Sequence, residues 1–255
     1  MLKTAFLCTF TILILLDIPV LAEETETTIE ITLEEIIDGV KIQQERIVTE
    51  IEDAIFSADA IYREVDKDGK LKKDLIARRR IYMGRNNKRY EECLSMVLNG
   101  EELKGKKLRK EFKDWQKKTK SQSETKMPMT SEGEGAYNYD LIGSEEWNGM
   151  EVWVVAFAPK KKKKEYIEGK GYVSKDSFNI VRVEFTPAKL PRVIENMRMS
   201  LTYSEVEGYW FPVKFDLKMT ISVGLLVEFF RMDVEVEDTY SNYKFNNQLD
   251  DSLFE

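Results

Sequence analysis

The side chains that carry most hydrolytic chemistry are missing or unpatterned in this chain. It contains no histidine, which excludes Ser-His-Asp and Cys-His catalysis, His-ligated zinc and a histidine pH switch. Asp53, Asp59, Asp66 and Asp68 lack the spacing of an EF-hand, and the last two fit a turn. A glycan hydrolase with two catalytic carboxylates is the weakest alternative, because the 46 Asp and Glu residues form no recognisable pair. We therefore expect a protein that is not an enzyme, with no catalytic residue, no metal and no cofactor.

Arg79 is the charged residue with the most informative position. It shares the alternation of Ala77 and Ile81, and so falls on an apolar register. A charge on such a face needs a partner. That partner is either an acidic residue of a covering lid or the head group of a ligand, and the alternative is that the strand bulges at this point. We therefore treat Arg79 as a possible head-group contact.

Two other polar features have simpler explanations. Residues 160–164 are five consecutive lysines after Pro159, which is typical of a solvated loop tip, with contact to anionic lipid head groups as the alternative. Cys93 lies on the polar register of its strand, and nothing near it in the sequence indicates an activated thiolate. The net charge of −7 argues against nucleic acid as a partner.

The N-terminus has the layout of a secretory signal peptide. Lys3 precedes an apolar run of about 12 residues, shorter than the roughly 20 that span a bilayer. The sequence Val-Leu-Ala at residues 20–22 supplies the small residues of a cleavage site, and Glu23 follows instead of a lipid-accepting cysteine. We expect cleavage after Ala22 and export to the periplasm of a soluble protein, residues 23–255, that forms a single domain.

Hydrophobic periodicity predicts two helices. Thr32 and Glu35 form a capping box at the start of the first, residues 33–45, and the second covers residues 103–120. Residues 121–135 have little apolar content, so we predict a mobile loop there.

The rest of the chain is predicted to form strands joined by tight turns. The first three form a meander over residues 48–65, 71–83 and 90–98, with turns at residues 66–69 and 86–87. Seven more follow over residues 136–143, 150–158, 165–173, 178–186, 195–203, 210–219 and 225–238. Apolar and polar residues alternate cleanly in 195–203 and 210–219, which is typical of an antiparallel sheet with one wet face. A sheet of about ten strands curls strongly, and it buries its apolar face by closing or by taking helices into its concave side.

Four stretches of the sequence resemble the outer-membrane lipoprotein-sorting proteins, which are the Lol-type carriers and their relatives among periplasmic lipid carriers and envelope-stress regulators. The stretches are LEEIIDGV at 33–40, GSEEWNGMEVW at 143–153, GKGYVS with IVRVE at 169–174 and 180–184, and YSNYKFN with DSLF at 240–246 and 251–254. The resemblance implies an α+β fold that is mainly β, a strongly curved antiparallel half-barrel with helices over its concave face. It also implies that acyl chains bind in a hydrophobic cavity.

The apolar strand faces are the candidate cavity, because methionine and aromatic side chains adapt well to alkyl chains. The alternative is a plain packed core. The candidates are Trp153, Val155, Phe157, Val181, Val183, Phe185, Met197, Met199, Leu201, Phe211, Phe215, Leu217, Phe230 and Met232.

We interpret the protein as a monomeric periplasmic carrier or chaperone for lipid or lipoprotein acyl chains on their way to the outer membrane. A partner protein of the cell envelope is possible. The alternative is a regulatory or sensor module that uses the same fold.

Overall fold

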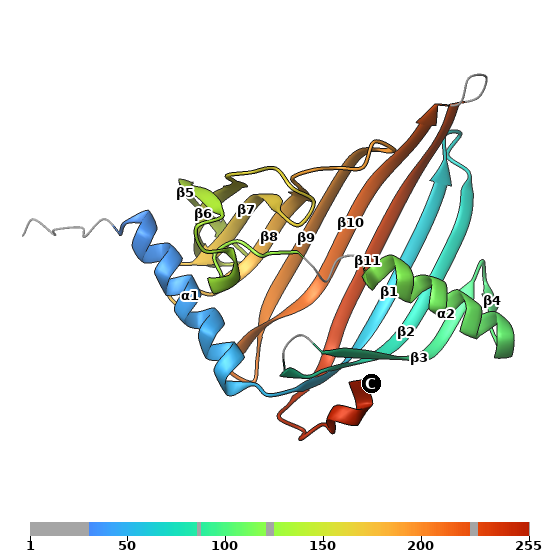
Figure 1. The fold of residues 1–255 in the computed structure, drawn as a ribbon, viewed down its shortest axis with the longest axis horizontal. Coiled ribbons are helices and arrows are strands. Elements are labelled where there is room, and N and C mark those ends of the chain that lie inside the picture. Colours follow the sequence, from blue (N-terminus) through green and yellow to red (C-terminus); the bar gives the residue numbers. More distant parts are fainter. Residues whose placement is uncertain (1–30, 86–87, 121–124, 225–228, 255) are drawn as a thin grey trace, which may run out of the picture. The chain divides into compact units, whose positions relative to one another are not determined.

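A computed structural model describes residues 31–85, 88–120, 125–224 and 229–254. Residues 31–255 form one compact unit, built on a single large antiparallel sheet with two long helices (Figure 1). The predicted signal peptide and the turn at residues 86–87 lie outside the described residues. Within the described residues, no helix has the length and apolar character needed to cross a membrane.

The helices and strands follow one another in a simple order. Their bounds are α1 Leu33–Glu50, β1 Ala54–Asp66, β2 Leu71–Met83, β3 Arg89–Leu98, β4 Glu101–Glu102, α2 Gly105–Lys120, η2 Ser131–Gly133, β5 Tyr137–Trp147, β6 Met150–Pro159, β7 Ile167–Ser174, β8 Ile180–Pro187, β9 Ile194–Val206, β10 Tyr209–Gly224, β11 Phe229–Phe245 and η3 Asp251–Phe254.

The strands form one sheet in the order β4-β3-β2-β1-β11-β10-β9-β8-β7-β6-β5. Every pairing is antiparallel. The pairing of β1 with β11 brings the first and last strands of the described chain together. Among the described residues β4 and β5 remain the two edges, so the sheet is open. The predicted fold class is confirmed. The described residues form eleven strands where about ten were expected, because the two-residue strand β4 had no sequence signal.

Strand register shows that one face of this sheet is apolar almost from edge to edge. Residues paired directly across antiparallel strands share a face. One row of paired residues runs from β6 to β3 through Val155, Gly171, Val183, Leu201, Phe215, Asp238, Ala60, Ala77 and Met96. The next row runs through Phe157, Gly169, Phe185, Met199, Leu217, Val236, Tyr62, Leu75 and Leu98. We call this the inner face.

The two helices cover opposite ends of the inner face. Ile36 and Val40 of α1 lie in one buried cluster with residues of β5 to β8, including Val183. Trp115 of α2 lies in a second cluster with Ala60 and residues of β2 and β3. The inner face of β9, β10 and β11 lies between these two clusters (Figure 1).

Helix α1 is longer than its sequence pattern indicated. The predicted capping box is present, with Thr32 and Glu35 bonded to each other. The helix then continues to Glu50, so the strand predicted from Val48 begins only at Ala54. The β-branched Val48 suggested a strand, but its side chain is 80% exposed on the last turn of the helix, so tertiary context rather than propensity sets the boundary.

The described part of the segment predicted to be a mobile loop is ordered instead. Met129 is fully buried in the cluster under α1, and its N–H donates to the Tyr139 hydroxyl at 2.8 Å. The Tyr137 hydroxyl donates to the Lys126 carbonyl at 2.6 Å. Gly171 makes room for Met129, because a Cβ at Gly171 would lie 2.6 Å from the Met129 methyl carbon. A single buried methionine was too weak a sequence signal to reveal this packing.

Candidate functional site

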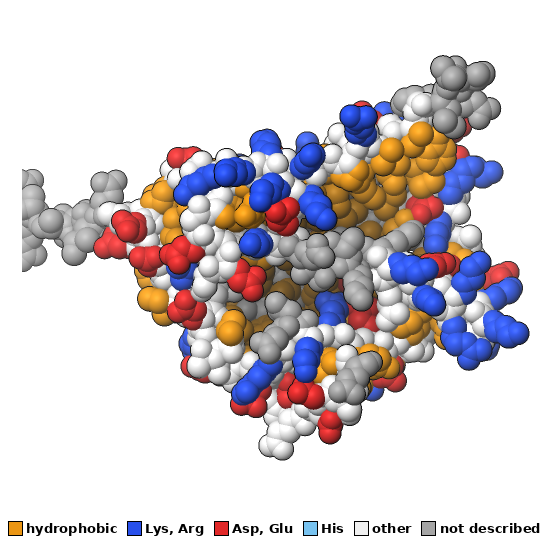
Figure 2. Space-filling model, in the orientation of Figure 1, with side chains coloured by type: hydrophobic (Ala, Val, Ile, Leu, Met, Phe, Trp, Pro, Cys, Tyr) orange, Lys and Arg blue, Asp and Glu red, His pale blue; other side chains and the backbone are white. Residues whose placement is uncertain are grey.

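The middle of the inner face is an apolar strip that neither helix cluster includes. We call it the central belt, and its members are Met197, Met199 and Leu201 of β9, Phe215, Leu217 and Met219 of β10, and Val234 and Val236 of β11. Met199, Leu217 and Val234 are buried, while the other five are partly exposed. Figure 2 shows hydrophobic side chains at the surface along the β10–β11 hairpin, between the two helix-covered ends.

The opposite face of the same strands has a different chemistry. Lys214 is within 3.1 Å of Asp216 and 3.0 Å of Glu237, and Lys218 is 3.0 Å from Glu235. The sheet is therefore polar and ion-paired on one side of β10 and β11 and apolar on the other. An apolar strip of adjacent strands, flexible through its methionines, can hold alkyl chains but offers no group for bond-breaking chemistry.

The structure distributes the predicted site residues over several places. Trp153, Val155, Phe157 and Val183 are buried beneath α1, where they form core packing, and Phe185 borders them. Five lie in the central belt: Met197, Met199, Leu201, Phe215 and Leu217. Met232 and the 47% exposed Phe230 continue the belt along β11, opposite Ile221 and Val223.

Two of the predicted residues lie elsewhere. Val181 packs with Val152, Val154 and Tyr172 in a separate cluster, on the face away from α1. The register shifts between Tyr172 and Val173, so the simple alternation that grouped Val181 with Val183 fails there. Phe211 belongs to a third cluster, where its ring is tilted against that of Tyr243 with ring centroids 5.4 Å apart.

Arg79 is buried on the inner face and paired with acidic residues. Its side chain is 1% exposed, and one guanidinium nitrogen bonds both carboxylate oxygens of Asp238. A second nitrogen lies 3.7 Å from Glu91. Burial opposes the charge on Arg79, but Asp238 and Glu91 raise its pKa above the ordinary value, so the guanidinium stays charged. The partners that the sequence required come from β11 and β3 of the same sheet and not from an acidic residue of a lid.

Trp115 of α2 covers this ion pair. The Arg79 guanidinium carbon lies 4.8 Å from the centre of the Trp115 ring, a cation–π contact. Arg79 is therefore shielded from solvent in this structure. Sequence reasoning missed Asp238. The signal that could have found it is the alternation along β11, in which Asp238 follows Val234 and Val236 on the inner face.

Cys93 also faces Arg79, because the two residues pair directly across β2 and β3. The expectation that Cys93 lies on the polar register was therefore wrong. The register shifts between Arg78 and Arg79, and this moves Cys93 to the inner face. Burial raises the pKa of the Cys93 thiol, which makes it a poor nucleophile.

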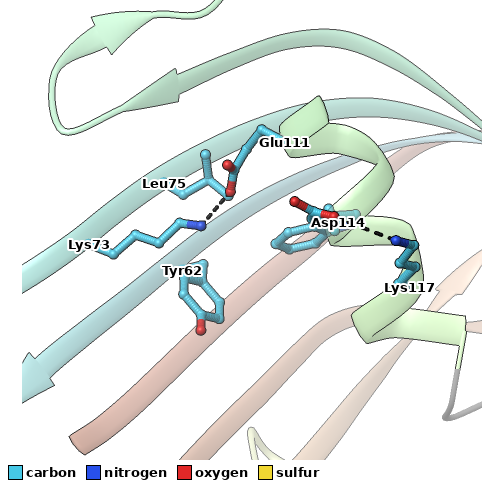
Figure 3. A pocket seen from close by; sticks show the side chains of 7 residues that line it. Tyr62, Lys73, Leu75, Glu111, Asp114 and Lys117 are labelled. Carbon is cyan, nitrogen blue, oxygen red and sulfur yellow. Dashed lines mark hydrogen bonds and ion pairs between the residues drawn. The ribbon is translucent and has the colours of Figure 1, made fainter. Parts of the chain in front are cut away.

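An open pocket of about 350 Å³ lies between α2 and strands β1 and β2 (Figure 3). Tyr62, Lys73 and Leu75 enter it from the strands, and Glu111 and Asp114 from the helix. Lys73 and Glu111 are hydrogen-bonded across it. Its lining mixes charged side chains, such as Lys73 and Glu111, with the apolar side chains of Leu75 and Trp115. The described residues contain no group of three potential metal ligands.

The fold and the belt together define a class: an open antiparallel sheet whose helices leave a central apolar strip between them. Residues 64–243 match the model of a family of unknown function, DUF5686. The chain belongs to this family. No curated protein matches the chain significantly.

Solved structures with a similar arrangement come from several bacteria. A DUF1329 family protein from Desulfovibrio piger is 15% identical, with 87% of this chain and 96% of that chain covered and a TM-score of 0.43. A LolA superfamily protein from Nitrosomonas europaea is 13% identical, with 89% and 98% covered and a TM-score of 0.42. An outer membrane lipoprotein-sorting protein domain from Vibrio parahaemolyticus is 14% identical, with 86% and 97% covered and a TM-score of 0.40. Likenesses at this level say nothing about function.

Proposed function

We propose that this protein is a non-enzymatic carrier or chaperone of the periplasm, which binds acyl chains of lipids or lipoproteins on its inner face for transport to the outer membrane. The central belt is the observation that carries the proposal. Residues 23–255 act as one domain, and the binding residues are those of the belt together with Phe230 and Met232. Arg79 meets a ligand head group only in a state with α2 displaced.

The belt supports this function because its apolar rows continue beneath both helices without interruption except at Asp238. Leu201 and Phe215 pair directly, and Met199 pairs with Leu217 on the next row. An alkyl chain laid along such rows contributes on the order of 0.8 kcal/mol for each methylene removed from water. An acyl chain of ordinary length therefore gains enough binding free energy from its buried apolar area and needs no specific polar contact.

Helix α2 is suited to act as a movable cover. Leu108, Phe112 and Trp115 are its residues in the apolar cluster, while its exposed positions carry lysine and arginine, including Lys106 and Lys110. Displacement of α2 extends the apolar strip from the belt toward Ala60, Ala77 and Met96. Reversible burial of acyl chains beneath this helix is the proposed mechanism.

Native mass spectrometry of the protein, purified without detergent after export, tests the proposal. We expect a mass excess that extracts into organic solvent as lipid, or uptake of added phospholipid or acylated peptide by a delipidated sample. A bare mass with no uptake of either would contradict the proposal.

Matched variants locate the binding surface. Leu201→Ser and Phe215→Ser are expected to weaken binding of a fluorescent acyl probe by about tenfold each, since each removes apolar area from the belt. The control is Lys218→Ser, which alters the polar face of the same strand. Equal effects of inner-face and outer-face variants would show that the probe binds elsewhere.

A further inference from the structure

The strands of the sheet end along two long edges, which are distinct from the edge strands β4 and β5 and which differ in charge. Because every strand pairs antiparallel with its neighbour, the C-terminal ends of β6, β8, β10 and β1 all lie along one edge. The C-terminal ends of β5, β7, β9 and β2 lie along the other. Glu145, Glu146, Glu205 and Glu207 are exposed on that second edge.

The first edge is basic, and we call it the basic edge. The five lysines 160–164 form the β6–β7 connection, and Lys189 and Arg192 lie in the β8–β9 connection, all of them exposed. Lys162 and Lys163 pair with Glu168 and Glu165 at 3.0 Å and 3.5 Å. Lys160, Lys161 and Lys164 make no ion pair with any described residue. Figure 2 shows lysine and arginine side chains along this side of the molecule.

Exposed apolar side chains accompany the basic edge. Phe230 is 47% exposed, Val193 46% and Leu71 49%. Phe230 lies where the β10–β11 hairpin extends beyond its neighbours, since β9 pairs with β10 only as far as Ile221 and β1 pairs with β11 only as far as Met232. Figure 1 shows this hairpin reaching past the rest of the sheet.

We propose that the basic edge docks on the surface of an anionic phospholipid bilayer, with the lysines of residues 160–164 against the head groups and Phe230 at the interface. Lysines near such a surface attract anionic lipids, and an aromatic side chain suits the boundary between head groups and acyl chains. This inference goes beyond acyl binding, because docking needs no uptake of lipid.

A bilayer fits this edge better than an acidic protein. Val193 lies in the β8–β9 connection, Phe230 near the start of β11 and Leu71 at the start of β2, so these exposed side chains are spread along the basic edge. Five consecutive exposed lysines, of which Lys162 and Lys163 are paired with acidic residues, together with separate exposed apolar side chains along the same edge, match a flat surface of repeated negative charge. The exposed end of the apolar inner face then lies next to the lipid.

Co-sedimentation with vesicles tests the proposal. The exported protein is mixed with vesicles of phosphatidylcholine alone, or of equal parts phosphatidylcholine and phosphatidylglycerol. The basic-edge variant carries Lys160→Gln, Lys161→Gln and Lys164→Gln. The matched control carries Arg85→Gln, Lys88→Gln and Lys175→Gln, which removes the same charge from the opposite edge, where these side chains pair with Glu52, Asp251 and Glu151.

The expected result is binding to the anionic vesicles only, weakened by about tenfold or more in the basic-edge variant and by raised salt. The binding of the control variant to anionic vesicles should stay within about twofold of that of the unmodified protein. Val193→Ser, at an exposed position outside the proposed acyl-binding residues, should also weaken vesicle binding, with the salt dependence retained. Binding of a soluble acyl probe by each variant is measured separately, so a failure of docking is distinguishable from a failure of acyl binding.

Three results would overturn the proposal. One is equal binding to both kinds of vesicle, and another is an equal loss in the basic-edge variant and its control. The third is no vesicle binding together with salt-sensitive binding of polyglutamate, which would assign the edge to an acidic protein.

Discussion

Arg79 shows how far one residue can be interpreted without a structure. Its place on an apolar register predicted a buried charge in need of a partner, and the structure confirms that need. The partner itself could not be predicted, because Asp238 lies 159 residues away and meets Arg79 only through the pairing of β1 with β11. Burial strengthens the attraction between Arg79 and Asp238, and for the same reason either charge destabilises the fold when its partner is removed.

Arg79→Met is therefore expected to lower the free energy of unfolding by about 3–5 kcal/mol, because it leaves Asp238 buried without its cation. The double variant Arg79→Met/Asp238→Leu should recover much of that loss. Urea unfolding monitored by circular dichroism measures both. Arg80→Met, at the exposed pair with Glu92, is the control and should cost less than about 1 kcal/mol. A double variant no more stable than the single one would contradict this reasoning.

Gly39 governs how α1 meets the sheet. It lies inside the helix, where glycine is unfavourable by about 1 kcal/mol relative to alanine. A Cβ at Gly39 would lie 2.4 Å from the ring of Phe178. Phe178 in turn packs near Trp153, with ring centroids 5.4 Å apart. The sequence pattern predicted the helix and its cap, but not this contact, because Phe178 is far from Gly39 in the sequence.

Gly39→Ala is expected to destabilise the protein by about 1–3 kcal/mol, since overpacking against Phe178 exceeds the gain in helix propensity. Thermal unfolding measures the change. The control is Val48→Ala on the exposed last turn of α1, where better helix propensity should leave stability unchanged or slightly raised. The double variant Gly39→Ala/Phe178→Ala should show a smaller loss than the sum of its parts if the clash is the cause.

At the scale of an element, strand positions were more predictable than their faces. Regular alternation located β9 and β10 and grouped Met199 with Leu201 and Leu217, as the structure confirms. Val181 and Cys93 were assigned to the wrong faces because each lies beside a register shift, which alternation in a single strand does not reveal. The buried position of Met129 depends on the space at Gly171 and was equally hidden.

At the scale of the whole molecule, one sheet connects the parts covered by α1 and by α2. Strands β9, β10 and β11 link the two clusters through continuous pairing. The sequence predicted a broad antiparallel sheet, yet it could not show that the first and last strands are neighbours. That pairing leaves the inner face open at the middle and places the belt where neither helix cluster reaches.

A single sheet predicts a single unfolding transition for both helix-covered ends. One variant keeps only Trp115, on α2, and another keeps only Trp153, beneath α1. In each variant the urea midpoint measured by tryptophan fluorescence should equal the midpoint measured by circular dichroism. Coincident transitions are the mark of two-state unfolding. A fluorescence midpoint that differs from the circular dichroism midpoint of the same variant would show that the two ends unfold independently.

The open edge at β5 has a consequence for how copies of the protein behave when concentrated. An unpaired edge strand is a template for strand addition by another chain, which leads to polymers. Here the register of β5 shifts between Leu141 and Gly143, and Gly143 takes a φ of 151° that breaks the regular ladder. The exposed carboxylates of Glu145 and Glu146 repel an identical strand. The same edge that leaves the sheet unclosed therefore carries its own protection against self-association.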